Sequence, residues 1–418
     1  MERKLKLYQG GIELYTVKDV IFYSVFLLAY LLGGAIFISG IFPFRLFHLA
    51  LISLLMIPLK GLCFGKVEKV FFFFFLEIGV SAIFNHVSVM QFLSFLRFII
   101  VPYSIYFLVK KGLDAKNIRL VLRFIIWIAC LQPPVVLLQQ TFFETINSIL
   151  PSSTRFTEDN RIDFSFGTFY VSDDPSMSFF LMTVILFLLF DKRNNYFIKR
   201  KMALAGYLTL GVLLSNSQLS NILVVLIWVA YAFRNFRIKD IVKTAVIFGL
   251  TILLLMGFGL FDFFQWKLYD VIQQASFETI QNASGSNFQE GKFERTAAVY
   301  YYITQPLKVF GDGPSAYYNA VSGEYVLGNN GQVFTLYAEI GVLGLLIGYF
   351  IFYVIGKTNL VSRPMFVGCL LLISALTITS FPLTDASIML TYCIFVKTNL
   401  VSNGVPESNV KSNSLIIE

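Results

Sequence analysis

The chain has 418 residues, of which 56% are hydrophobic and only 14% are charged, and its mean hydropathy is +0.71. A soluble domain carries closer to a quarter charged residues, so this composition excludes the soluble globular class and indicates an integral membrane protein. The net charge of +8 does not indicate nucleic-acid binding, because the basic residues form short clusters between apolar runs and no basic helix with interleaved aromatics occurs.

Apolar runs recur along the whole chain at lengths close to the roughly 20 residues that a helix needs to cross a bilayer. They predict an all-α polytopic membrane protein with about 12 transmembrane helices. The runs lie at 19–39, 42–58, 68–84, 90–109, 118–138, 175–191, 203–216, 218–233, 242–261, 331–356, 364–380 and 385–401. Residues 1–402 are expected to form a single integral membrane domain, followed by a polar cytoplasmic tail at 403–418.

The positions of the basic residues predict an orientation. Most of the 33 lysines and arginines fall in alternate inter-run segments, starting with the N-terminal one. Since positive charge favours the cytoplasmic side, both termini are expected in the cytoplasm of a bacterial inner membrane. Two long loops, at about 139–174 and 262–330, then lie on the outer face.

The four cysteines lie in or beside apolar runs, and none has CxxC spacing. We interpret them as packing residues, and we predict neither a disulfide framework nor a metal site. The pair Asp173 and Asp174 is interpreted as an exposed acidic turn before Pro175.

Arginines provide the first candidate site. Arg155, Arg161 and Arg295 lie in the outer loops, against the charge bias, and Arg97 stands within an apolar run. A guanidinium presents a fixed fork of donors that matches phosphate oxygens, which suggests diphosphate binding at the outer membrane face. The alternatives are solvated loop charges and, for Arg97, an ion pair with a glutamate inside the spans, for which Glu77 and Glu339 are the obvious candidates.

The segment 295–348 carries the most specific pattern. An arginine-led stretch is followed by Pro306-Leu, by Gly311-Asp-Gly313, by a polar spot, and by Glu339-x-Gly-x-x-Gly344 at the opening of a span. Earlier in the chain, Gly167-Thr-Phe leads through Pro175 into another run. In this order, the motifs resemble those of the O-antigen polymerase and ligase superfamily.

The resemblance implies a glycosyltransferase with a GT-C-like architecture. Its donor and acceptor would be undecaprenyl diphosphate-linked oligosaccharides, and attack at the anomeric carbon would expel the lipid diphosphate without a metal or other cofactor. Membrane lipids and a chain-length regulator are further candidate partners, and no nucleic acid is implied. By this resemblance, Arg295 and Arg161 would be catalytic, and they would bind the diphosphate together with Arg97 and Arg155. Glu339 or Asp312 would be the general base. The residues that would contact sugars are Asn329, Asn330, Gln218, Tyr301 and Tyr317.

Several departures bear on the choice within the superfamily. Asn329 and Asn330 stand where ligases of this group carry a histidine, which favours a polymerase. Gln218 replaces an arginine in the Ser215-Asn-Ser joint, and Arg161 precedes Gly167 by a longer spacing than usual.

Two alternative functions remain. One is a ligase that moves glycan to a lipid A core or a protein, and the other is a lipid-linked oligosaccharide flippase. The two carboxylates also have alternative roles. Glu339 is also explained by helix packing beside Gly341 and Gly344, and Asp312 by a turn between two glycines.

Overall fold

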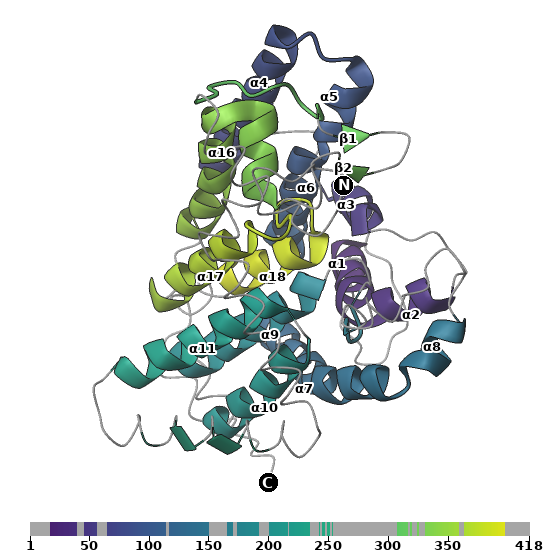
Figure 1. Cartoon of the computed structure of the whole chain (residues 1–418), viewed down its shortest axis with the longest axis vertical. Coiled ribbons are helices and arrows are strands. Elements are labelled where there is room, and N and C mark those ends of the chain that lie inside the picture. Colours follow the sequence, from purple (N-terminus) through teal and green to yellow (C-terminus); the bar gives the residue numbers. More distant parts are fainter. Residues whose placement is uncertain are drawn as a thin grey trace, which may run out of the picture.

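The computed structural model describes most of the hydrophobic chain (Figure 1). The described residues are 17–39, 46–56, 65–113, 117–149, 165–169, 174–191, 200–215, 217–234, 307–316, 318–319, 324–325, 331–358 and 363–397, with a few positions between 242 and 253. Most of them are helical. The exceptions are turns and connecting segments, including 165–169 and 307–316, and a short antiparallel hairpin, β1 (Tyr318–Asn319) with β2 (Glu324–Tyr325), in which Tyr318 pairs with Tyr325. The predicted all-α class is therefore confirmed for this part of the chain.

The helices coincide with the predicted apolar runs, except for the run at 242–261, most of which lies outside the described residues. The first group is α1 (Val17–Leu27), the π-helical turn η1 (Leu28–Leu32), α2 (Gly33–Ser39), α3 (Leu46–Leu54), α4 (Lys66–Phe84), α5 (Val89–Phe95), α6 (Arg97–Gly112), α7 (Ile118–Thr141) and α8 (Phe143–Ile149). The second group is α9 (Asp174–Phe190), α10 (Lys201–Leu214), α11 (Gln218–Phe233), α16 (Gln332–Thr358), α17 (Arg363–Leu376) and α18 (Ala386–Lys397).

Within the described ranges, four helical stretches are long and apolar enough to cross a membrane. They are Val17–Ile36, Val89–Gly112, Ile118–Thr141 and Gln332–Lys357. Five shorter apolar helices accompany them, at Pro175–Phe190, Lys201–Leu214, Leu219–Phe233, Pro364–Leu376 and Ala386–Lys397. These lengths and compositions support the membrane-protein class.

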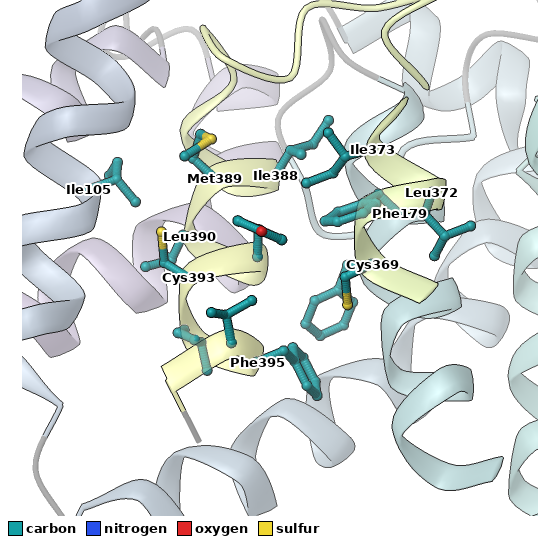
Figure 2. Close-up of a cluster of buried hydrophobic side chains, with 14 of the residues drawn as sticks. Ile105, Phe179, Cys369, Leu372, Ile373, Ile388, Met389, Leu390, Cys393 and Phe395 are labelled. Carbon is teal, nitrogen blue, oxygen red and sulfur yellow. The ribbon is translucent and has the colours of Figure 1, made fainter. Parts of the chain in front are cut away.

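Helix α18 forms the centre of the bundle (Figure 2). Every residue from Ala386 to Val396 is buried, as expected for a helix that is apolar on all sides. Side chains from α6, α9 and α17 surround it, including Ile105, Phe179 and Cys369. Cys369 and Cys393 are free and buried there, which confirms their predicted packing role, and Cys63 lies outside the described residues.

The lysine-rich ends of three helices meet at one end of this bundle. The Nζ of Lys397, at the end of α18, donates to the carbonyl oxygens of Val109, Lys110 and Leu113 at the end of α6, over 2.5 to 2.8 Å. The Nζ of Lys110 forms an ion pair at 3.1 Å with Glu68 in the first turn of α4. Basic groups near helix C-termini also interact favourably with the helix dipole. The opposite end of α4 therefore lies away from this basic cluster.

Helix α7 contains Pro133 and Pro134 and is nevertheless continuous over Ile118–Thr141. A proline removes the N–H that would bond the carbonyl four residues earlier, so Pro134 frees the carbonyl of Cys130. The hydroxyl of Tyr207 in α10 donates to that oxygen at 2.9 Å. Packing of α10 on α7 thus satisfies a backbone group that the proline leaves open.

Candidate functional site

A break inside α16 is the centre of the candidate site. Gly341 has φ 75° and ψ −171°, a conformation that is essentially restricted to glycine, and the helical path is interrupted there. The predicted span over 331–356 is found as the apolar helical stretch Gln332–Lys357, and the structure adds a break within it at Gly341.

Residues 307–316, which include the Gly311-Asp-Gly313 motif, fill the break by backbone pairing. The N–H groups of Asp312 and Gly313 donate to the carbonyls of Ala338 and Glu339 at 2.8 and 2.9 Å. In return, the N–H of Val342 donates to the carbonyl of Lys308 at 3.0 Å. The two carbonyls and the N–H that the interruption frees in α16 all find partners in this one segment. Such pairing is what buried backbone groups require.

The close approach of the two backbones depends on glycine. A Cβ at Gly341 would lie 2.0 Å from the carbonyl oxygen of Val309, and one at Gly311 would lie 2.4 Å from the carbonyl carbon of Glu339. Gly311 also has a positive φ of 68°. Both contacts are with backbone atoms, which cannot move aside as a side chain can. The two glycines of the sequence motifs therefore meet each other across the docked segment.

The C-terminal end of α4 supports the same junction. The hydroxyl of Ser81 lies 2.6 Å from the carbonyl oxygen of Phe310 and 3.1 Å from that of Glu339, so it bridges the docked segment and the break. The amide of Asn85 donates to the carbonyl of Gly311 at 3.4 Å. The rings of Phe84 and Phe310 stack with centroids 5.2 Å apart. Helix α4 thus contacts both the docked segment and the break in α16.

Glu339, a predicted general base, is fully buried in this junction. Its Oε2 accepts a hydrogen bond of 3.0 Å from the backbone N–H of Ser315, which has a positive φ of 57°. The hydroxyls of Ser315 and Ser94 are 2.9 Å apart, which links the carboxylate to α5. The Glu339 carboxylate therefore holds the end of the docked segment in place.

Asp312, the other carboxylate candidate, is more accessible. One third of its side chain is exposed, and it forms an ion pair of 2.5 Å with Lys308 one turn earlier. Its backbone is fixed by the bond to Ala338, whereas its carboxylate faces a partly exposed cation. Of the two carboxylates, Asp312 is the one that a polar substrate reaches without unpacking the junction.

Arg97 begins α6, directly after the short helix α5. It is half-buried, with its guanidinium carbon 5.5 Å from the ring centroid of Phe98. Ser94, which contacts Ser315, lies three residues before it. The Oε1 of Glu77 has no hydrogen-bond partner among the described residues, and the ion pair expected between Arg97 and a glutamate stays a prediction. The structure therefore places this arginine next to the junction.

A second motif segment, 165–169, is held by glutamine side chains of α7. The amide of Gln139 donates to the carbonyl of Gly167 at 2.8 Å and accepts from its N–H at 2.9 Å. The amide of Gln132 accepts from the N–H of Thr168 at 3.0 Å and donates to its hydroxyl at 2.8 Å. Gly167 has a φ of 61°, which explains the glycine at this turn.

The other side of this segment packs on the first helices of the chain. The N–H of Gly34 in α2 donates to the carbonyl of Thr168 at 3.2 Å. The ring of Phe169 lies 5.5 Å from that of Tyr30 and 5.3 Å from that of Phe180, so it wedges between α9 and the N-terminal helices. The hydroxyls of Tyr30 and Thr391 are 2.9 Å apart, so a hydrogen bond connects the N-terminal helices at this point to α18.

Gln218 opens α11 at a different corner of the bundle. The preceding Ser217 accepts a hydrogen bond from the N–H of Ser220 as the helix N-cap. The hydroxyls of Ser215 and Ser178 are 2.6 Å apart, so the joint between α10 and α11 is fastened to α9. Of the predicted joint at 215–218, the described residues Ser215, Ser217 and Gln218 lie between two packed helices.

The remaining predicted site residues lie outside the described residues. They are Arg155, Arg161, Arg295, Tyr301, Tyr317, Asn329 and Asn330. Their proposed roles stay predictions.

The sequence interpretation missed the polar residues that build the junction. Ser81 and Asn85 support the docked segment, and Ser94 reaches it from α5. A signal was present, since Glu77, Ser81 and Asn85 recur every four residues along an otherwise apolar helix and so share one face.

The sequence was also compared with known proteins. No family model matches the chain, and no curated protein is significantly similar to it. The function is therefore argued from residues and geometry.

Proposed function

We propose that this chain is a membrane glycosyltransferase that polymerises undecaprenyl diphosphate-linked repeat units at the outer face of a bacterial inner membrane. The observation that carries this proposal is the docked segment 307–316. It fixes Asp312 beside the buried Glu339, next to Arg97, at the end of α4 remote from the lysine-rich cluster. A lipid-linked substrate would meet polar groups there without leaving the membrane surface.

The proposal includes a fuller membrane topology than the four long apolar stretches establish. We propose about 12 spans in a GT-C-like arrangement, with both termini in the cytoplasm, because the basic clusters alternate between the predicted segments. The lysine-rich ends of α4, α6 and α18 would then face the cytoplasm, and the 307–316 junction would face outward.

The proposed reaction needs a leaving group, a base and a charge stabiliser. The acceptor hydroxyl attacks the anomeric carbon of the donor glycan. A bond forms between the acceptor oxygen and that carbon, and the bond from that carbon to the lipid diphosphate breaks. Arg295 and Arg161, with Arg155 and Arg97, would stabilise the charge that develops on the departing diphosphate. Asn329, Asn330, Gln218, Tyr301 and Tyr317 are the proposed sugar contacts.

The two carboxylates are given different roles. Asp312 is one-third exposed and is proposed to accept the acceptor proton, whereas fully buried Glu339 is proposed as a positioning residue that holds Ser315. A carboxylate that already accepts a backbone N–H inside the packed junction is less available to a substrate.

A second candidate function has one specific observation in its favour. Discontinuous helices are typical of transporters, and α16 is broken at Gly341. That break, however, is filled by the chain's own backbone rather than left open to line a cavity. We therefore rank a lipid-linked oligosaccharide flippase below the polymerase.

The decisive experiment is an assay of the purified chain with a defined lipid-linked repeat unit in the absence of added metal. A polymerase converts this substrate into a ladder of longer lipid-linked chains. Arg295→Gln should lose at least about a hundredfold of that rate, as expected for removal of a charge-stabilising donor. The matched control is Lys292→Gln, which removes a neighbouring charge and should elongate normally. Substrate movement between leaflets without elongation would contradict the proposal and favour the flippase.

A further inference from the structure

A groove lies between α4 and α16, two helices that pack against each other (Figure 1). Its volume is about 330 Å³. Apolar side chains of both helices line it together with one carboxylate, and the lining residues are Val70, Phe73, Leu76, Glu77, Val80, Ile347 and Phe350. Phe73, Leu76 and Phe350 are 59%, 43% and 49% exposed, so the rim of the groove faces the lipid.

Glu77 is the unusual member of this lining. The residue is only 9% exposed, and its Oε1 is buried without a hydrogen-bond partner among the described residues. Neither Arg97 nor any other cation in that part of the chain forms an ion pair with it. A buried carboxylate without a partner is unfavourable, which makes an ionisable residue within a span a site for an external group.

The depth of Glu77 limits what that external group is. Glu77 lies eleven residues beyond Lys66, which opens α4. At about 1.5 Å per residue the separation is roughly 16 Å. In the proposed topology, in which α4 is a span, Glu77 therefore lies near the middle of a hydrocarbon core about 30 Å thick. Water and lipid headgroups are remote from this depth. A hydrocarbon chain reaches it but supplies no hydrogen-bond donor for Oε1.

We propose that this groove is the docking site for a transmembrane helix of a partner protein that carries a lysine or arginine at mid-bilayer depth. The groove is smaller than one helical turn with its side chains, which is about 10 Å across. The partner helix therefore lies against the exposed rim of Phe73, Leu76 and Phe350. It inserts a single long basic side chain, which pairs with Glu77 in the low-dielectric groove.

A second copy of this chain offers no exposed basic side chain in the middle of a described helix, since Arg97, which lies within an apolar run, is half-buried. The exposed basic residues of α7, Arg119 and Arg123, lie in its first two turns and so close to a membrane boundary. The inferred partner is a different membrane protein, and the inference stands independently of the proposed enzymatic activity.

The test uses the full chain in phosphatidylcholine vesicles with two synthetic single-span peptides. Both peptides have a leucine and alanine core, and they differ only at the central residue, which is lysine or leucine. Energy transfer from a donor fused after Glu418 to a labelled peptide reports association. We expect the lysine peptide to bind the unaltered chain about tenfold more tightly, equivalent to about 1.4 kcal/mol.

Four variants locate that preference. Glu77→Leu and Glu77→Gln should abolish it, whereas Glu144→Gln, which neutralises an exposed carboxylate in α8, should keep it. Glu77→Lys should instead prefer a peptide with a central aspartate, which guards against loss by misfolding alone. Equal binding of the two peptides to the unaltered chain, or a preference that survives Glu77→Leu, would overturn the proposal. Labelling of the groove by a photoactivatable alkyl lipid that the lysine peptide fails to displace would also overturn it, in favour of a lipid site.

Discussion

Two motif segments are docked into the bundle by different means. Residues 307–316 pair through their backbone with the interrupted helix α16, and the neighbouring α4 adds hydrogen bonds from Ser81 and Asn85. Residues 165–169 pair with an intact helix, α7, through the side-chain amides of Gln132 and Gln139. A helix thus accepts an extra segment either by giving up its own hydrogen bonds or by extending amide groups from its surface.

The difference has a consequence for rigidity. At Gly341 the backbones of α16 and of segment 307–316 are in direct contact, with no side chain between them. An atom added there therefore meets backbone atoms, which are fixed in place. At Gly167, the nearest atoms to an added Cβ are the Oε1 of Gln132 and the Sδ of Met177, which belong to flexible side chains. We therefore expect the first junction to tolerate less change than the second.

The largest effect is expected for Gly341→Ala. The added Cβ would lie 2.0 Å from the carbonyl oxygen of Val309, and the positive φ of Gly341 is disfavoured for alanine. Strain and overpacking together should lower the free energy of unfolding by about 3 kcal/mol or more. Titration of the purified chain with denaturant in mild detergent measures this change.

Gly79→Ala is the matched control, because a Cβ at that helical position meets no atom within 4 Å. It should leave the free energy of unfolding unchanged within about 1 kcal/mol. If the two glycine variants unfolded alike, the α16 junction would not be the rigid element that its contacts indicate.

The next largest effect is expected for Gln139→Leu, which removes both bonds to Gly167. The N–H and carbonyl of Gly167 would be left buried, at a cost of about 2 kcal/mol. Hydrogen exchange should accelerate in residues 165–169 and stay slow in residues 307–316. Gln91→Leu, which alters a glutamine in the exposed capping box of α5, is the control and should not affect 165–169. Faster exchange in both segments after Gln139→Leu would show that the two junctions are coupled, and not separate as drawn here.

A smaller effect is expected for Gly167→Ala. The positive φ costs about 1 to 2 kcal/mol for a residue with a side chain, and the nearest atoms, in the amide of Gln132 and the sulfur of Met177, belong to flexible side chains and not to backbone. Thermal unfolding should therefore place this variant between Gly79→Ala and Gly341→Ala. A loss as large as that of Gly341→Ala would contradict the flexible character assigned to the side-chain clamp.

The sequence located both segments but not the means by which each is held. Apolar length placed the helices, and the glycine motifs marked 165–169 and 307–316 as special. Gln132 and Gln139 were overlooked, although their seven-residue spacing puts two amides on one face of α7. The break at Gly341 was not predicted, because glycines spaced along an apolar run also fit close helix packing. What distinguishes a broken helix from a continuous one here is segment 307–316, whose backbone groups pair with those of α16.

The smallest effect on stability is expected for Asp312→Asn, which tests whether the docked segment has a chemical role as well as a structural one. Its ion pair with Lys308 is partly exposed and spans one turn, so its loss should cost about 0.5 kcal/mol or less. Elongation of lipid-linked repeat units should nevertheless fall at least about a hundredfold, because an amide does not accept the proton. Lys308→Met breaks the same ion pair but keeps the carboxylate, and it should retain elongation. If the two variants lost activity equally, the ion pair itself would be what matters, and the proton acceptor would have to be sought outside the docked segment. If neither lost activity, the backbone pairing at Gly341 would be the whole contribution of 307–316, and the carboxylate at its tip would be a turn residue.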